Sequence, residues 1–496
     1  MTPGPLDAAG SLALLPRLDK APTGIVGLDE ITGGGIPRGR STLVVGSAGA
    51  GKTLFAVECL VNGAVDYGEP GVLISFEESG EDLAQNAASL GHDLRRLERD
   101  GLLLIDHVRL EHCEIGETGE FDLEPLLLRI QDAVDEIGAK RIALDTIESI
   151  FGGISNEAIL RAELRRLFLW LRERGMTAII TAEQGTESLT RHGIEEYVSD
   201  CVILLDHRVL NQVSTRLLRV VKYRGTEHGT NEYPFLIDRS GITVFPITST
   251  ELAYEVSAER VPTGVPDLDA MLGGAGYYRG SSVLLTGTAG TGKTSIAGRF
   301  VEAACERGER CLYFAFEEAA SQIRRNLAPV GIDLARWEEA GGLRIHATRP
   351  TAFGLEAHLA LLFKRIEEHA PTVVVVDPVS NLVSIGTPLE VQVMLVRLID
   401  YLKTRRITAL LTGLADSAGD REESGMEVSS LSDTWIRLQA VRTDGRRRRT
   451  ISILKSRGME HSDEIRELRL GPGGVGIEEI APDERHGAVS AGSAGP

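Results

Sequence analysis

The chain has 496 residues, of which 42% are hydrophobic and 5% aromatic, and its formal net charge is −19. A surface this acidic repels phosphate backbones, so nucleic-acid binding is not predicted. Its five cysteines form no CxxC pair, and no signal peptide or run of 18 apolar residues is present, which predicts a cytoplasmic protein with buried thiols and no membrane span.

The same motifs occur twice in the same order. TGIVGLDEITGGGIPRG at 23–39 and GSAGAGKT at 46–53 recur at offsets of 240 and 241 residues (263 − 23 and 287 − 46). Two later landmarks recur at 232 and 233 residues (377 − 145 and 455 − 222). Near-constant offsets indicate a tandem duplication. We therefore expect an N-terminal tail at 1–16, two homologous domains at 17–247 and 248–480, and a Gly-rich, disordered tail at 481–496.

Each copy alternates short β-rich runs with amphipathic helical segments. In the first copy the expected parallel strands are 40–46, 71–76, 102–108, 141–145 and 177–182. The segment AILRAELRRLFLWLRERG at 158–175 has apolar residues at helical spacing. Strands that alternate with helices predict an α/β fold with a mainly parallel sheet covered on both faces. The runs at 202–206, 215–225 and 241–245 are expected to extend the sheet in antiparallel fashion.

Each copy contains a GxxxxGK[ST] motif between a predicted strand and a predicted helix. In such a P-loop, backbone amides surround the β-phosphate, the lysine neutralises the β- and γ-oxygens and the following threonine ligates Mg²⁺. A glycine-rich turn without ligand is the alternative. The sequence predicts ATP and Mg²⁺ as cofactors, with the nucleotide bound by Gly46, Ser47, Ala48, Gly49, Ala50, Gly51, Lys52, Thr53, Leu54 and Ser89 in the first copy and by Gly287, Thr288, Ala289, Gly290, Thr291, Gly292, Lys293, Thr294 and Ser295 in the second.

Acidic residues follow two strands of each copy, where strand ends converge on the phosphates. Asp145 and Asp377 end apolar runs and are expected, with Thr53, Thr294 and Glu317, at the Mg²⁺ sites. The pairs Glu77–Glu78 and Glu317–Glu318 supply a candidate catalytic base in each copy. We expect the first residue of each pair to be that base. The alternative is that these carboxylates only begin a helix, where they suit the helix dipole.

The two P-loops, the FEE pairs, the two KxRG segments and GIEEYVSD at 193–200 resemble the KaiC family, the double RecA-like ATPases and autokinases of the cyanobacterial circadian clock. The resemblance runs from about residue 17 to about residue 475. It implies a homohexameric double ring with ATP held between neighbouring subunits. By this resemblance, the neighbour's nucleotide is contacted by Lys222, Tyr223, Arg224, Thr226 and His228 in the first ring and by Arg449, Lys455, Ser456 and Arg457 in the second. A surface KxR on an edge strand is the alternative.

Residues 427–435 read EVSSLSDTW. Aligning the Ser-Asp pair of each copy places Ser429 and Ser430 opposite Glu196 and Tyr197. The family carries an autophosphorylated Ser-Thr pair here, so Ser429 matches its serine, Ser430 replaces its threonine, and Ser424 falls at a lesser site. We expect both serines to accept phosphate across the subunit interface, with Glu317 as base. Loop serines that cap a turn are the alternative.

The leading hypothesis is an ATP-hydrolysing serine autokinase and autophosphatase that acts as a hexameric switch in clock- or stress-related signalling. The alternatives are a RecA/DnaB-like DNA-dependent motor and a scaffold that binds ATP only to assemble. GRRRRT at 445–450 fits a solvated hairpin tip better than a nucleic-acid patch, because no aromatic residues interleave with it. The C-terminal segment differs from that of the family, so regulation by a KaiA-type partner is not predicted, while binding of a KaiB-like protein stays open.

Overall fold

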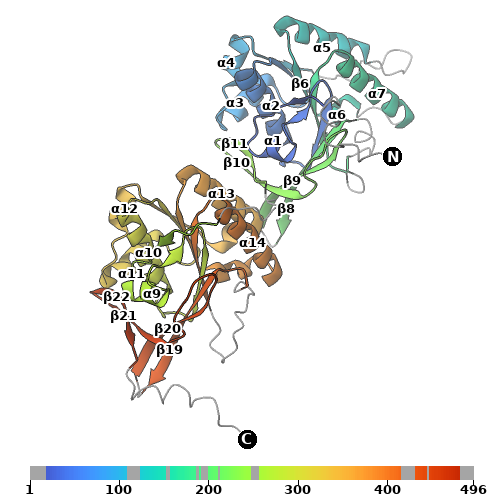
Figure 1. The fold of residues 1–496 in the computed structure, drawn as a ribbon. Coiled ribbons are helices and arrows are strands. Elements are labelled where there is room, and N and C mark those ends of the chain that lie inside the picture. The colour runs from blue at the N-terminus through green and yellow to red at the C-terminus, as the bar shows by residue number, and fades with distance from the viewer. Residues whose placement is uncertain are drawn as a thin grey trace, which may run out of the picture. The chain divides into compact units, whose positions relative to one another are not determined.

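The computed structural model describes residues 18–108, 123–151, 157–185, 189–190, 199–210, 213–246, 256–414, 430–443 and 446–480. The chain divides into two compact units, Met1–Pro246 and Ile247–Pro496. Each unit contains a nine-stranded sheet with helices packed against it (Figure 1). The expected α/β fold class, with two tandem domains, is confirmed. The tails predicted at 1–16 and 481–496 lie outside the described residues.

The strands of the first unit follow the order β11-β10-β9-β8-β3-β7-β6-β4-β5. The parallel strands are β3 (Ser41–Gly46), β4 (Gly71–Ser75), β5 (Leu103–His107), β6 (Arg141–Asp145), β7 (Thr177–Glu183) and β8 (Cys201–Leu210). The antiparallel extension is β9 (Val213–Tyr223), β10 (Glu232–Asp238) and β11 (Gly241–Val244). The run at 202–206, which was expected to belong to this extension, instead lies in β8 and pairs with β3 in parallel, so that expectation was wrong. A separate two-stranded sheet is formed by β1 (Lys20–Ala21) and β2 (Ile36–Pro37). The helices are α1 (Leu28–Ile31), α2 (Lys52–Tyr67), α3 (Gly80–Ala88), α4 (Leu94–Arg99), α5 (Glu124–Ile137), α6 (Ile147–Phe151) and α7 (Glu157–Glu173).

Both faces of this sheet are buried. Along β3, Val44 joins a hydrophobic cluster that includes α2, whereas Leu43 and Val45 join a second cluster that includes α5 and α7. Successive side chains of a strand point to opposite faces, so one apolar run can serve two cores. This explains why the parallel strands are continuously apolar in the sequence.

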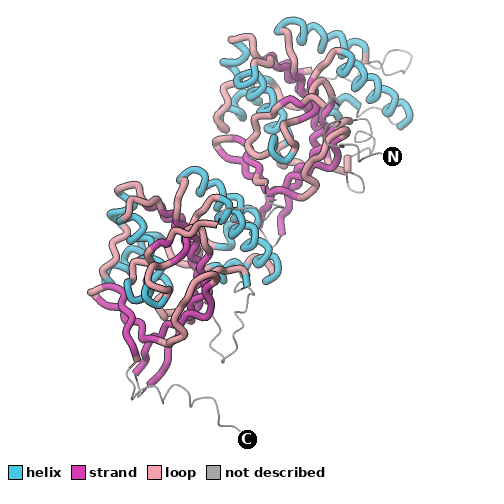
Figure 2. The backbone as a smooth tube through the Cα atoms, viewed as in Figure 1, coloured by secondary structure: helices cyan, strands magenta, loops and turns pink. Residues whose placement is uncertain are grey.

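The second unit repeats this topology, with the order β16-β15-β17-β18-β14-β19-β20-β21-β22. Figure 2 shows strands with helices around them in both units. Its strands are β12 (Arg260–Val261), β13 (Tyr277–Tyr278), β14 (Ser282–Gly287), β15 (Cys311–Ala315), β16 (Leu343–Ala347), β17 (Val373–Asp377), β18 (Thr408–Leu414), β19 (Thr434–Thr443), β20 (Arg446–Ser456), β21 (Arg466–Gly471) and β22 (Gly474–Glu479). Its helices are α9 (Pro266–Met271), α10 (Lys293–Glu306), α11 (Ala320–Leu327), η2 (Ala328–Val330), α12 (Ala335–Glu339), η3 (Pro350–Ala352), α13 (Leu355–His369), η4 (Val379–Ser384) and α14 (Pro388–Thr404). No helix within the described residues is both long and apolar enough to span a membrane.

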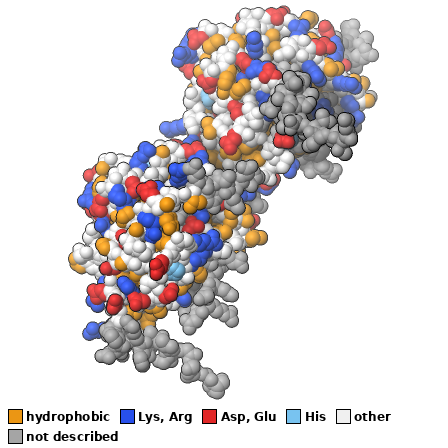
Figure 3. All heavy atoms as spheres, viewed as in Figure 1, with side chains coloured by type: hydrophobic (Ala, Val, Ile, Leu, Met, Phe, Trp, Pro, Cys, Tyr) orange, Lys and Arg blue, Asp and Glu red, His pale blue; other side chains and the backbone are white. Residues whose placement is uncertain are grey.

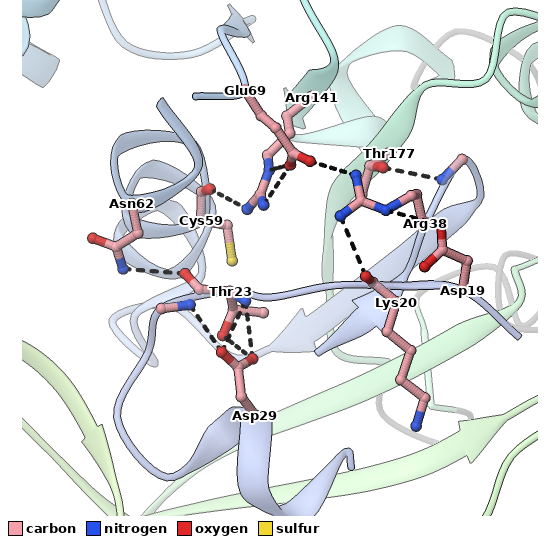
Figure 4. Close-up of polar contacts among 12 residues, drawn as sticks. Asp19, Lys20, Thr23, Asp29, Arg38, Cys59, Asn62, Glu69, Arg141 and Thr177 are labelled. Atoms are coloured by element: carbon pink, nitrogen blue, oxygen red, sulfur yellow. Dashed lines mark hydrogen bonds and ion pairs between the residues drawn. The ribbon is translucent and has the colours of Figure 1, made fainter. Parts of the chain in front are cut away.

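A buried ion-pair network lies at the start of β6, near the amino end of the sheet (Figure 4). The Arg141 side chain is 0% exposed, and its guanidinium donates to the Glu69 carboxylate (Nε–Oε2, 2.7 Å) and to the Cys59 carbonyl (2.9 Å). Arg38 pairs with the same carboxylate. Removing one partner of a buried pair leaves an unpaired charge, so the loss of Glu69 or of Arg141 alone would destabilise the first unit.

Candidate nucleotide sites

Each P-loop joins a central strand to a helix. In the first unit the loop runs from β3 to α2, and the Lys52 Nζ donates to the carbonyls of Gly46 (2.9 Å) and Ser47 (3.1 Å). In the second unit the Lys293 Nζ makes the same contacts with Gly287 (2.6 Å) and Thr288 (3.0 Å). Both ammonium groups therefore fold over the loop, where they can exchange carbonyl partners for phosphate oxygens.

The residue before each of these lysines has a backbone that needs glycine. Gly51 and Gly292 have φ angles of 104° and 106°, a region that side chains rarely adopt. Each helix thus begins directly after the turn, with its first amide groups directed at the loop, which suits a bound anion.

A threonine hydroxyl and a buried aspartate meet beside each loop. The Thr53 Oγ1 donates to the Asp145 Oδ2 (2.8 Å), and the Thr294 Oγ1 donates to the Asp377 Oδ2 (3.0 Å). Burial raises the pKa of Asp145, and Glu77 raises it further, while hydrogen bonds from Thr181 and Thr53 oppose the shift. Hydroxyl and carboxylate oxygens are the ligands that Mg²⁺ prefers, so this donor set fits the expected metal.

The two carboxylates of the first FEE pair point in different directions. The Glu77 Oε1 accepts hydrogen bonds from the Thr146 Oγ1 (2.9 Å) and the Ser149 Oγ (3.2 Å), both of which follow β6. The Glu78 Oε2 instead accepts from the Asn86 Nδ2 on α3 (3.0 Å). Only Glu77 is thus tied to the strand end that carries Asp145, which supports its selection as the base.

The second unit repeats the contact of the second carboxylate of the pair but not the contacts of the first. The Glu318 Oε2 accepts from the Asn326 Nδ2 on α11 (2.9 Å), as Glu78 does with its own asparagine. The Glu317 carboxylate is exposed and has no hydrogen-bond partner among the residues that the structure describes. It nevertheless lies close enough to Lys293 to oppose the burial that lowers the pKa of that lysine. Pro378 and Asn381 stand where the first unit has Thr146 and Ser149.

The cations assigned to a neighbour's nucleotide lie at the amino end of the sheet, opposite their own P-loop. The Arg224 amide donates to the Asp200 carbonyl (2.9 Å), and the Asp200 amide donates to the Ser41 carbonyl at the start of β3 (3.1 Å). Lys222 pairs with Val202 on the same edge. Their P-loop begins at Gly46, about 17 Å further along β3 at the usual rise of a strand.

Other residues assigned with these cations have structural contacts. Tyr223 is buried, and its hydroxyl donates to the Gly35 carbonyl (2.9 Å). The His228 ring centroid lies 6.1 Å from the Tyr223 ring, and the Thr226 Oγ1 donates to the neighbouring Glu227 carbonyl (3.2 Å). The Ser89 hydroxyl donates to the Gln85 carbonyl at the end of α3 (3.2 Å). Their roles at a nucleotide stay predictions.

In the second unit, Lys455 and Arg457 lie at the corresponding amino end of the sheet. The Arg457 amide donates to the Asp433 carbonyl, and its Nη2 donates to the Ser430 carbonyl, both at 2.8 Å. Ser430 is exposed there, while Ser429 and Ser424 lie outside the described residues. Ser456 is buried, and its hydroxyl lies 3.1 Å from that of Thr434.

Arg449 lies at the other end of β20 from Lys455 and Arg457, and its expected contact with a neighbour's nucleotide stays a prediction. Its Nε donates to the carbonyl of Gly290 in its own P-loop (3.1 Å). The pairing of β14 with β19 and of β19 with β20 explains this position of Arg449. Gly287 pairs with Leu438, and Arg449 pairs two residues further on, with Ala440. A single antiparallel strand therefore carries Arg449 to its own loop and Lys455 to the opposite edge.

The sequence reasoning missed Arg216, the first unit's counterpart of Arg449. The two are 233 residues apart (449 − 216), the offset that also relates Lys222 to Lys455. Arg216 pairs with His207, two residues beyond the Leu205 that pairs with Gly46. Its Nε is buried and has no hydrogen-bond partner within the described part of the chain. The repeat offset alone could have identified it.

The comparisons with known proteins cover both units of this architecture. The model of the KaiC ATPase family matches residues 21–249 and 261–481, so it covers both units. The chain is 54% identical over 475 residues to "Circadian clock protein KaiC2" of Synechocystis sp., covering 95% of this chain and 83% of that protein. It is 37% identical over 463 residues to "Circadian clock oscillator protein KaiC" of Synechococcus elongatus, covering 93% and 89% of the two chains.

These matches extend through both P-loops and both sets of edge cations. KaiC family proteins are ATPases with serine/threonine autokinase activity, which favours the KaiC-like function over the alternative of a DNA motor. An ATPase of this family binds ATP. The resemblance noted in the sequence is confirmed, and the chain belongs to the KaiC family of ATPases.

Proposed function

We propose that this chain is a homohexameric ATPase and serine autokinase that completes each nucleotide site with cations from the neighbouring copy. The observation that carries the proposal is the placement of Arg224 and Arg457 at the amino end of their sheets. Each lies at the end of its unit opposite its own P-loop. This position supports a role at a nucleotide held by another copy, and a head-to-tail contact of this kind closes a ring when its rotation allows it.

Hydrolysis in the first unit would use Glu77 as general base. The Thr146 and Ser149 hydroxyls hold its Oε1, which leaves Oε2 to take a proton from a water molecule. The water oxygen attacks the γ-phosphorus in line, the bond to the bridging oxygen of the β-phosphate breaks, and ADP leaves. Lys52 and the neighbour's Lys222 and Arg224 stabilise the charge that spreads over the γ-oxygens.

Phosphoryl transfer in the second ring would use Ser430, with Ser429 beside it in the sequence. The Ser430 hydroxyl would lose its proton to Glu317 of the neighbour that binds ATP, and its oxygen would attack the γ-phosphorus of that ATP. The bond to the bridging oxygen of the β-phosphate would break, and ADP would leave. Glu317 suits a bulky protein acceptor because no described hydroxyl occupies its carboxylate. The new phosphate, with a charge of about −1.5 to −2, would lie beside Arg457, which already contacts the Ser430 backbone.

Mg²⁺ would be held by Thr53 with Asp145 in the first unit, and by Thr294 with Asp377 and Glu317 in the second. When bound, it would neutralise charge on the β- and γ-phosphates. The hydroxyl and carboxylate pairs at 2.8 and 3.0 Å support this assignment.

Two measurements test the proposal. Light scattering with and without ATP and Mg²⁺ should show a hexamer only with nucleotide. Incubation with ATP followed by phosphopeptide mapping should place phosphate on Ser429 and Ser430, and the Ser429→Ala/Ser430→Ala variant should remove it. A chain that stays monomeric while it hydrolyses ATP fully would contradict the ring, and phosphate absent from residues 424–434 would contradict the autokinase.

The relatives' names concern circadian clocks, so a clock- or stress-related switch is the cellular role to test. A KaiB-like protein is the first partner to examine, by co-elution with the ATP-bound and the ADP-bound chain. Retention of such a protein in one nucleotide state only would support the switch, and equal elution in both states would contradict it.

A further inference from the structure

A basic pocket of about 370 Å³ opens at the amino end of the first unit's sheet. It lies between α7 and the strand ends, and its walls include Ser41, Arg161, Arg165, Arg172, Asp200 and Arg224. Figure 3 shows Lys and Arg side chains on the side of this unit where Figure 1 places α7. Four arginines thus face one pocket in a chain whose net charge is −19.

Three of these arginines lack a carboxylate partner. Arg161, Arg165 and Arg172 are exposed, and none of their guanidinium groups forms an ion pair or a hydrogen bond with any residue that the structure describes. The one acidic wall residue, Asp200, is already paired with Arg40 (3.3 Å). Like charges that share a pocket repel one another, so the arrangement favours binding of an anion.

The second unit has a basic pocket at the same corner, lined by Arg279, Lys403, Arg406, Asp433 and Arg457, but it has no cations at the positions of Arg161 and Arg165. Counting back from the shared strands by 231 residues (408 − 177), Gln392 and Val396 on α14 stand where α7 has Arg161 and Arg165. Lys403 matches Arg172, and its Nζ is held by the Asp433 carboxylate (2.9 Å). Of the positions of these three α7 arginines, only that of Arg172 holds a cation in the second unit, and this lysine has a carboxylate partner.

We propose that Arg161 and Arg165 bind the terminal phosphate of the nucleotide held by the neighbouring copy's first P-loop. The inference rests on the proposed trans role of Arg224, because that residue forms a wall of the same pocket. Guanidinium groups bind phosphate oxygens in bidentate fashion and stay charged at all physiological pH values. The first ring would then recognise ATP over ADP with cations that the second ring does not have.

The test replaces Arg161 and Arg165 with the residues that stand at the matching positions of the second unit, glutamine and valine. Arg161→Gln/Arg165→Val should be made in a Lys293→Ala background, which removes the P-loop lysine of the second unit, so that the measured affinity reports the first unit. Apparent affinity for a fluorescent ATP analogue, measured with hexamers at fixed salt, should fall about tenfold or more, in line with charge-assisted contacts at interfaces. Affinity for the matching ADP analogue should change less than threefold, and the salt dependence of ATP binding should become shallower.

Arg166→Gln is the matched control, since Arg166 lies on α7 but pairs with Glu124 outside this pocket. It should leave both affinities unchanged. An equal loss for ATP and ADP would show that the arginines contact the neighbour's protein surface instead, and no loss for either would show that they contact nothing; both outcomes overturn the proposal. If the background chain itself never assembles with ATP, the proposed hexamer fails. If the background chain assembles and the double variant has the same affinities for ATP and ADP as the background chain, the inference about Arg161 and Arg165 fails while the proposed hexamer stands.

Discussion

Removal of the Thr146 hydroxyl tests whether Glu77, rather than the neighbouring Glu78, is the catalytic base of the first unit. Thr146→Val keeps the branched shape of the side chain but deletes the Oγ1 that donates to Glu77 at 2.9 Å. A hydrogen bond to a charged group contributes about 1.5–3 kcal/mol, and the Ser149 contact at 3.2 Å remains. A loss near the lower limit raises the barrier enough to slow turnover about tenfold.

The assay is steady-state phosphate release in the Glu317→Gln/Glu318→Gln background, where the first unit provides the turnover. ATP affinity should stay within about twofold, because Lys52 and the loop are untouched. Ser149→Ala is the companion variant and should cost less, since its bond is longer. Unchanged turnover in Thr146→Val would refute the idea that the hydroxyl positions the base. A fall that comes entirely from weaker ATP binding would refute it as well.

Three further outcomes follow from the described contacts. Burial raises the pKa of Glu69, but Arg38 and Arg141 outweigh burial and leave the pKa lowered. Glu69→Gln should therefore reduce the unfolding free energy by about 3–5 kcal/mol at neutral pH. The difference in unfolding free energy from wild type should shrink as the pH falls below 4.5, the ordinary pKa of a glutamate. A constant difference down to pH 3 would contradict this. Glu77→Gln should abolish most steady-state hydrolysis with ATP still bound, whereas survival of turnover until Glu317→Gln is added would make the second unit the main hydrolase. Arg216→Ala should weaken ATP binding to the first unit about tenfold, as loss of a charged hydrogen bond does, while Arg219→Ala on the opposite face of β9 should not; equal effects would show a structural role only.

Features fixed by local sequence were predicted well. The duplication, the parallel strands and the two P-loops each depend on a short pattern whose geometry follows from the chain itself. Asp145 and Asp377 lie beside their threonines because parallel strands bring their carboxyl ends to one edge, and their roles at Mg²⁺ stay predictions.

Contacts between distant segments were harder to predict. The hydroxyl that holds Glu77 comes from a residue 69 positions away, and nothing in either segment marks the pair. The position of Arg449 next to Gly290 could not be predicted from the sequence, because it depends on the pairing of β20 with β19, and a few residues along β20 separate the two ends of the sheet. The basic pocket joins residues of α7 to the ends of β3 and β9, so only the folded chain reveals it.

The central claim is that one copy completes the nucleotide site of the next. The most direct measurement mixes two variants that are each inactive in the first unit, Lys52→Ala and Arg224→Ala, both in the Glu317→Gln/Glu318→Gln background. An interface between the intact P-loop of one variant and the intact Arg224 of the other is complete. Random mixing at equal amounts should therefore restore roughly a quarter of the parent's turnover. A mixture as inactive as its separate components would contradict the account.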